Sequence, residues 1–501
     1  MGFILRQSVK FTALNVFLIG IGALSIIFIY PNNLKLYGEL NMLYFSANLI
    51  TPVLSLGFSN VILKFHEKFK AAGLESSYIS FSLYGATLTA FVGFVVYMLL
   101  EVWVINILNY FTIPVAFIKD NYFYIGALSF LLVINSSMIY YSSIQKRIVI
   151  PELLTNGGYK IFVPMLILTS VYLPLSTKQF FVITIAYFIV IFIMVLKYCI
   201  SIKQNSWKPK FNIFSNLELF ETVSFMFLSS VNNFFYHLIF KFDIIVVGIY
   251  LSPKTAGFYS ILVFVISFLE IPNKSISQIA TPLVSKYNAQ ANWKELSKLY
   301  TESSQNLFIL GSFIYFIIIF NFEYLYFFIP KLRMDDINLL IVILLGLSRL
   351  IDMTFSLNSQ IILFSKKFYI YNLFTVLVGL INCFGTQILV KNFGITGVVS
   401  SVLISILLFN FIKTIFIWAS MGMNPVNRKI VFFSIFVFIL HLVWYLAPKI
   451  QSPYIGILVN LILLVLLYVG YILKFKPSPI INDLICEIRD KQFLNKMLLK
   501  K

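Results

Sequence analysis

The sequence predicts an all-α polytopic membrane protein, and three of its properties carry that prediction. Of its 501 residues 60% are hydrophobic and only 11% are charged, and its mean hydropathy is +0.91. Apolar runs long enough to cross a hydrocarbon layer of about 30 Å recur along the whole chain. Basic residues gather in alternate loops between the runs. A water-soluble globule is excluded by this composition.

Fourteen apolar runs are expected to span the membrane. The first follows Arg6 and Lys10 as a signal peptide would, but it is too long and lacks a small-residue cleavage site, so we expect it to remain as a helix. The runs lie near 11–30, 40–62, 78–100, 121–142, 150–173, 179–200, 220–250, 255–283, 304–329, 337–362, 368–390, 394–420, 430–448 and 452–473.

The distribution of basic residues predicts the orientation of these spans. With the N-terminus in the cytoplasm, the inside segments hold 25 lysines and arginines and the outside loops hold 8. Loops on the cytoplasmic side carry such an excess in membrane proteins. Both termini are therefore expected to be cytoplasmic, and this pattern explains the net charge of +19 without nucleic acid as a partner.

An internal repeat predicts how the spans are grouped. Residues 36–52 resemble residues 256–272, with Gly38 matching Gly257, and the basic pair at 146–147 recurs at 366–367. Parallel repeats of this kind occur in transporters that hold substrate between two halves, although chance similarity between apolar segments is the alternative. We expect two pseudo-symmetric six-helix lobes plus two C-terminal helices. The expected divisions are 1–210 for the N-terminal lobe, 211–425 for the C-terminal lobe, 426–475 for spans 13 and 14, and 476–501 for a cytoplasmic amphipathic tail.

Several chemistries are absent from the sequence. No loop is long enough for an extramembrane catalytic domain, and no nucleotide-binding or protease motif is present, so we do not expect an enzyme. The three cysteines and three histidines are scattered, which predicts neither a disulfide framework nor a metal site. No cofactor is expected.

Charged residues inside the spans are the candidate functional residues, because a charge in hydrocarbon needs a partner or a water-filled cavity. Some have ordinary explanations. Glu270 and Lys274 are spaced to form an ion pair on one helix, as are Arg349 and Asp352. Lys413 lies near a predicted cytoplasmic helix end and is expected to extend its ammonium to the surface. The full set is Lys160, Lys241, Asp243, Glu270, Lys274, Arg349, Asp352 and Lys413.

Lys160 and Lys241 have no acid at helical spacing in the sequence. Lys241 also ends a stripe of polar residues four apart, which must face the protein interior. Hydrogen bonds between helices explain its neutral members, but a surplus of cations favours an anionic cargo, with phosphate as the natural group. The expected substrate-binding residues are Asn48, Lys160, Asn233, His237, Lys241, Lys274 and Arg349, and the expected coupling or inter-lobe residues are Asp243, Glu270 and Asp352.

Three segments resemble the bacterial polysaccharide and O-antigen flippases of the multidrug/oligosaccharidyl-lipid/polysaccharide exporter superfamily. They are D-I-I-V-V-G-x-x-L-x-x-x-x-x-G-x-Y at 243–259, L-S-L-G-F-S-N at 54–60 and G-I-T-G at 394–397. The resemblance covers nearly the whole chain in span number, orientation and repeat, and its glycine-based motifs indicate the superfamily more strongly than the substrate.

The resemblance implies a two-lobed bundle that moves undecaprenyl-diphosphate-linked oligosaccharide across the bacterial inner membrane by alternating access. Lys160, Lys241 and Arg349 would then receive the diphosphate, and other membrane proteins of polysaccharide assembly would be further partners. A multidrug and toxin extrusion antiporter and a peptidoglycan-precursor flippase are the alternatives. The resemblance leaves open which sugar and which coupling ion are used.

The predicted topology can be tested directly. Reporter fusions after residues 35, 178 and 391 should all be active outside the cytoplasm, because the charge pattern places these three loops there. Alkaline phosphatase and green fluorescent protein fusions report the two sides of the membrane. A fluorescent green fluorescent protein fusion at any of the three sites would place that loop in the cytoplasm and contradict the predicted topology.

Overall fold

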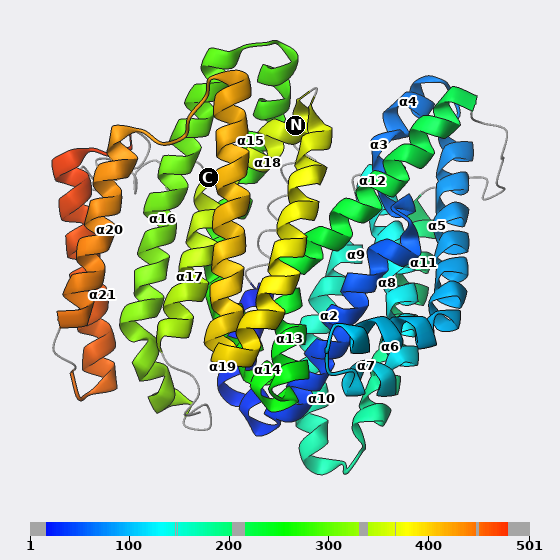
Figure 1. Cartoon of the computed structure of the whole chain (residues 1–501), viewed down its shortest axis with the longest axis horizontal. Helices are drawn as coiled ribbons and strands as arrows, with labels where there is room; N and C mark the ends of the chain where they lie inside the picture. Colours follow the sequence, from blue (N-terminus) through cyan, green and yellow to red (C-terminus); the bar gives the residue numbers. More distant parts are fainter. Residues whose placement is uncertain are drawn as a thin grey trace. The chain divides into compact units, whose positions relative to one another are not determined.

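The described part of the chain is helical throughout. The computed structural model describes residues 17–145, 147, 149–202, 216–329, 339–365, 367–446 and 450–478, and regular structure within these ranges contains helices and no strand (Figure 1). The predicted all-α polytopic class is confirmed. Lys146, Lys366 and the predicted tail helix over 481–501 lie outside the described residues.

The helices alternate between long spans and short connecting turns. After a helix that begins at Phe17, the first part of the chain forms η1 (Tyr30–Asn32), α2 (Leu34–Ser55), α3 (Phe58–Lys64), α4 (His66–Ala71), α5 (Glu75–Leu99), α6 (Glu101–Tyr110), α7 (Ala116–Asp120), α8 (Tyr122–Ile144), α9 (Val149–Glu152), η2 (Leu153–Gly157), α10 (Gly158–Tyr172) and α11 (Thr177–Ile202). The rest forms α12 (Asn216–Phe240), α13 (Phe242–Tyr250), α14 (Pro253–Ile266), η3 (Ser267–Leu269), α15 (Glu270–Ala289), α16 (Trp293–Phe328), α17 (Leu339–Thr354), α18 (Leu357–Phe364), α19 (Phe368–Met421), α20 (Arg428–Leu446) and α21 (Pro453–Phe475).

Breaks within the helices explain how these elements relate to the fourteen predicted spans. Nine helices in the described ranges are long and apolar enough to cross a membrane, or eleven if each of two bent pairs is one span. The pair that ends in α2 turns by 120°, which suits two spans joined by a tight turn. The helix α19 is interrupted at Gly394, where φ is 56° and ψ is −135°. The 150–173 run is divided among α9, η2 and α10.

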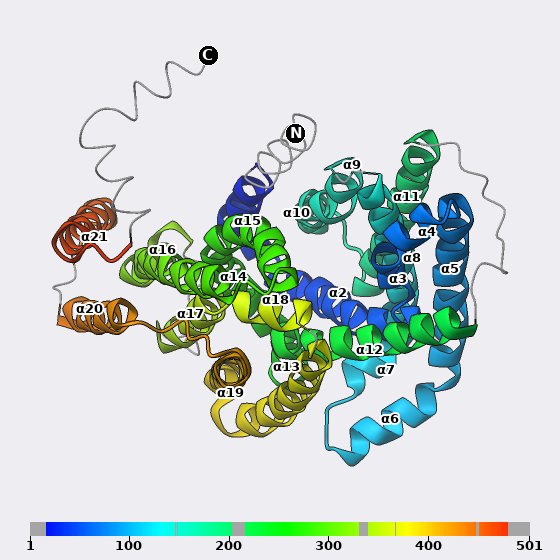
Figure 2. The same cartoon turned by 90° about the horizontal axis from the view of Figure 1, so that it is seen from above.

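The described residues form two compact units. Unit 1 comprises the described residues up to 261 and residues 375–398, and unit 2 comprises the described residues of 262–374 and those from 399 onward. The predicted lobe boundaries stay a prediction. In unit 1, α2 packs against α5, α8, α12 and α13 (Figure 2). In unit 2, α16 packs against α15, α17 and α21.

The helices α2 and α14 touch through their backbones in unit 1. A Cβ on Gly38 would clash with the carbonyl oxygen of Pro253, and a Cβ on Gly257 would clash with that of Leu34. These are the two glycines that the internal repeat pairs. The matching positions of the repeat therefore meet each other at one helix crossing.

Adding a methyl group at this crossing should destabilise the protein. Gly38→Ala and Gly257→Ala should each lower the unfolding free energy by about 1–3 kcal/mol, because the backbones must separate. Gly470→Ala in α21 is the matched control, since nothing lies within 4 Å of its added Cβ. Thermal unfolding in detergent measures the difference, and equal losses for Gly257→Ala and Gly470→Ala would contradict the close contact.

Candidate functional site

Of the two lysines predicted to bind cargo in unit 1, Lys241 lies close to an aromatic residue of α2, and Lys160 follows a tyrosine that stacks on α2. The Lys241 Nζ atom is 5.5 Å from the ring centroid of Phe45. The neighbouring Tyr44 stacks on Tyr159 of α10 at 4.4 Å between centroids, and Tyr159 directly precedes Lys160. Both lysines are half-buried. The helix α2 therefore connects the segments that carry Lys160 and Lys241.

Polar atoms on these same helices lack partners within the described part of the chain. They are buried side-chain atoms of α2, α10 and α12, and they comprise Asn41 Nδ2, Tyr159 Oη, Asn232 Oδ1 and His237 Nδ1. Buried polar groups are nearly always hydrogen-bonded, by protein, water or ligand. These atoms therefore have hydrogen-bonding capacity that the described residues leave unused. Asn48 instead donates to the Tyr44 carbonyl at 2.7 Å, and the predicted Asn233 is half-buried.

A helix break separates Lys241 from Asp243. Lys241 has φ −136° and ψ −12°, and its N–H donates to the His237 carbonyl at 2.9 Å, which ends α12. Asp243 then falls in the first turn of α13. A carboxylate is stabilised there by the exposed N–H groups and the dipole of the new helix.

Asp243 is held by residues of its own unit. It is 2% exposed, one carboxylate oxygen accepts from the Ile244 N–H at 3.0 Å, and the other accepts from the Tyr259 hydroxyl at 2.8 Å. Asp243 and Tyr259 are the first and last residues of the longest segment that resembles the flippases. This hydrogen bond ties α13 to α14, and it gives the motif a structural role.

A π-helical turn precedes Lys160. It covers Leu153–Gly157, and the Tyr187 hydroxyl donates to the Leu154 carbonyl within it at 3.3 Å. A Cβ at Gly158 would meet that same hydroxyl. Such turns shift the direction of the following side chains and are frequent at functional sites. Sequence reasoning missed the turn, and the Gly157–Gly158 pair was its only visible signal.

The predicted residues of unit 2 lie on α15 and α17. Glu270 and Lys274 form the expected ion pair at 3.8 Å, with the Lys274 side chain 75% exposed. Arg349 is buried. Asp352 accepts from Asn410 Nδ2 at 3.2 Å through one carboxylate oxygen.

Lys413 corrects one of our expectations. It does not reach the surface, because it is 1% exposed, and its Nζ atom donates to Ser359 Oγ at 3.2 Å. A helical side chain leaves its backbone toward the helix N-terminus. The stem of Lys413 therefore points away from the end of α19 at Met421, where the sequence analysis placed its ammonium.

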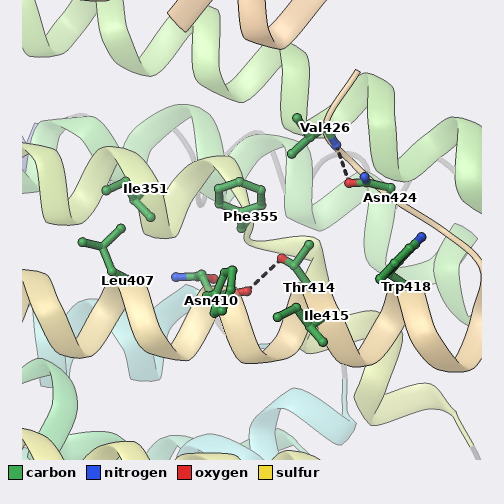
Figure 3. Close-up of a pocket in the computed structure, with 10 residues that line it drawn as sticks. Ile351, Phe355, Leu407, Asn410, Thr414, Ile415, Trp418, Asn424 and Val426 are labelled. Carbon is green, nitrogen blue, oxygen red and sulfur yellow. Dashed lines mark hydrogen bonds between the residues drawn. The ribbon is translucent and has the colours of Figure 1, made fainter. Parts of the chain in front are cut away.

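Sequence reasoning also missed a neutral network beside Lys413. Tyr300 donates to Asn358 Oδ1, and Asn358 Nδ2 donates to Thr414 Oγ1 at 2.9 Å. A pocket of about 340 Å³ adjoins this network between α17, the second half of α19 and the segment after it (Figure 3). Its lining is apolar apart from Asn410, Thr414 and Asn424. Among the described residues, no group of His, Cys, Asp and Glu could hold a metal ion.

Comparisons with known proteins identify the fold. No family model and no curated protein matches the sequence. Among solved structures, the lipid II flippase MurJ in an inward closed conformation matches with a TM-score of 0.65 at 15% identity, covering 92% of this chain and 98% of that one. The chain therefore has the fold of this flippase. An inward-facing multidrug resistance MATE family transporter of the MOP superfamily has a TM-score of 0.59 at 11% identity, covering 81% and 94%. Its outward-facing counterpart has a TM-score of 0.57 at 12% identity, covering 84% and 95%. These matches are transporters and a flippase rather than enzymes.

The bond between Asp243 and Tyr259 should contribute to stability. Tyr259→Phe leaves a buried carboxylate oxygen without its donor, so the unfolding free energy should fall by about 1–3 kcal/mol. Tyr110→Phe, at a tyrosine that is 83% exposed, is the control and should change little. Thermal unfolding of the purified variants measures both. Equal thermal stability of Tyr259→Phe and Tyr110→Phe would contradict a structural role for this hydrogen bond.

Proposed function

We propose that this protein is a flippase for lipid-linked oligosaccharides, which moves undecaprenyl-diphosphate-sugar repeat units across the bacterial inner membrane for surface polysaccharide synthesis. Two features support the proposal: the fold shared with transporters, and the basic residues within the predicted membrane spans. Lys160, Lys241 and Arg349 would bind the diphosphate. His237, Asn233 and Asn48 would contact the sugar, with Lys274 at the edge of the site.

The observation that carries this proposal is that the acids of the predicted site are already engaged. Asp243 accepts from Tyr259, Asp352 accepts from Asn410, and Glu270 pairs with Lys274. Each of these contacts lies within one unit. An organic cation entering this site would have to displace them, whereas the half-buried lysines suit a phosphate group.

Two alternatives share the fold. A multidrug antiporter would need acids available to a cationic drug, and the engagement of Asp243, Glu270 and Asp352 weighs against it. A peptidoglycan-precursor flippase would use the same lysines, because its cargo also carries a diphosphate. The sugar distinguishes it, so the test must include both lipids. We further propose that both termini are cytoplasmic and that other membrane proteins of polysaccharide assembly are partners.

Neutralising the lysines should slow lipid transport. Lys160→Gln and Lys241→Gln should each reduce transport about 10–100-fold, since a hydrogen bond to a charged group contributes about 1.5–3 kcal/mol. The measurement is the appearance of fluorescent undecaprenyl-diphosphate-oligosaccharide in the outer leaflet of proteoliposomes.

Lys178→Gln is the matched control, because Lys178 is exposed and lies outside the predicted site. It should transport as the unmodified protein does. Faster transport of lipid II than of the oligosaccharide lipid would favour the peptidoglycan precursor. Efflux of ethidium with no lipid transport would instead favour the multidrug antiporter and reject the proposal.

A further inference from the structure

Lys413 is a buried cation that the proposed cargo site does not use. Its Nζ atom lies 3.8 Å from the Phe409 ring centroid and donates to Ser359 Oγ. Within the described part of the chain, no carboxylate lies within 4.0 Å of this nitrogen. Lysine is rarely buried without a partner, because removing a charge from water is costly. A specific role is the natural explanation for its position.

A broken membrane helix faces Lys413 in unit 2. The helices α17 and α18 form a span bent by 40° between Thr354 and Leu357. Asp352 lies in the last turn of α17, Ser356 lies in the bend and Gln360 lies in α18. Both sides of the bend contact α19, because Asp352 accepts from Asn410 and Ser359 accepts from Lys413.

Several buried side-chain oxygen atoms at the bend and on α19 have no hydrogen-bond donor among the described residues. Ser356 Oγ, Gln360 Oε1 and Asn410 Oδ1 are buried, and none has a hydrogen-bond partner among the described residues. Asp352 adds a carboxylate. Side-chain and backbone oxygens at an interrupted membrane helix are the ligands that transporters use for small coupling cations. The ammonium of Lys413 carries three donors and makes one hydrogen bond.

We propose that the Lys413 ammonium is a tethered cation that takes the place of a free alkali ion at the oxygen cluster of Asp352, Ser356, Gln360 and Asn410. The side chain leans toward the N-terminal end of α19, and so toward the level of Asn410. This inference deepens the proposed function, because a transporter so built would not need Na⁺ or K⁺ at this position.

Removing the ammonium should expose an alkali-ion site. The full-length chain in detergent is unfolded thermally in sodium, potassium or choline chloride at about 100 mM and equal ionic strength. The unmodified protein should have one Tm in all three salts. Lys413→Ala should have a lower Tm in choline, and Na⁺ or K⁺ should raise it by about 2 °C or more.

Three further variants locate the effect. Lys413→Arg keeps the charge and should stay indifferent to the salt, as should Lys474→Ala, where an exposed lysine is removed. Lys413→Ala combined with Asp352→Asn should lose the response to Na⁺ or K⁺. A Lys413→Ala protein with equal Tm in all three salts would overturn the proposal.

If Lys413→Ala does not fold, the unmodified protein and Asp352→Asn provide the test of the tethered cation. A Tm that Na⁺ or K⁺ raises above its value in choline, and that no longer responds in Asp352→Asn, would mean that a free ion binds while Lys413 is present. That result would overturn the tethered-cation role. Equal Tm values in all three salts, with a lower but equally salt-independent Tm for Asp352→Asn, would support it. No lipid is present, so these outcomes are separate from those of the flippase assay.

Discussion

The cost of burying a charge in hydrocarbon governs the arrangement of this chain. An ionic group within a span needs a partner inside the protein or a water-filled cavity, because the bilayer core holds no water to solvate it. Asp243 meets Tyr259, Asp352 meets Asn410, and Lys413 meets Ser359 and the Phe409 ring. These contacts select which helix faces turn toward one another within each unit.

The helices break or bulge at or beside these charged residues. The break between α12 and α13 falls at Lys241, and the bend between α17 and α18 lies between Asp352 and Ser359. A π-helical turn ends three residues before Lys160. A straight helix fixes side-chain directions by its 3.6-residue period. An interruption re-aims the following residues and frees backbone groups, so a polar side chain can be directed without altering the apolar surface of the span.

The sequence was sufficient for the class of fold but not for these interruptions. Hydropathy locates runs of apolar residues, and the described part of each predicted run is mostly helical. Helical spacing also showed that Lys241 and Asp243 cannot pair along one regular helix, yet it could not reveal that α12 ends between them. The local sequence there contains no proline or glycine that would signal a helix end. The break depends on tertiary partners such as Tyr259, which is 16 residues away.

The expectation for Lys413 was wrong for a geometric reason. Hydropathy arguments treat a lysine near a helix end as free to extend toward that end, but the Cα–Cβ bond points toward the helix N-terminus. The same side chain placed near an N-terminal end could reach water easily. A lysine near the N-terminal end of a span can therefore extend to the surface more easily than one near the C-terminal end.

The glycine motifs and Asp243 stabilise helix contacts within unit 1. Gly38 and Gly257 allow the backbones of α2 and α14 to touch, and Asp243 and Tyr259 link α13 to α14 a few residues away. These contacts build a scaffold and leave the identity of the cargo open. In the proposed flippase, cargo selection would rest on other side chains, such as Lys160 and His237. One fold can serve different transport tasks when its scaffold contacts and its binding residues are separate.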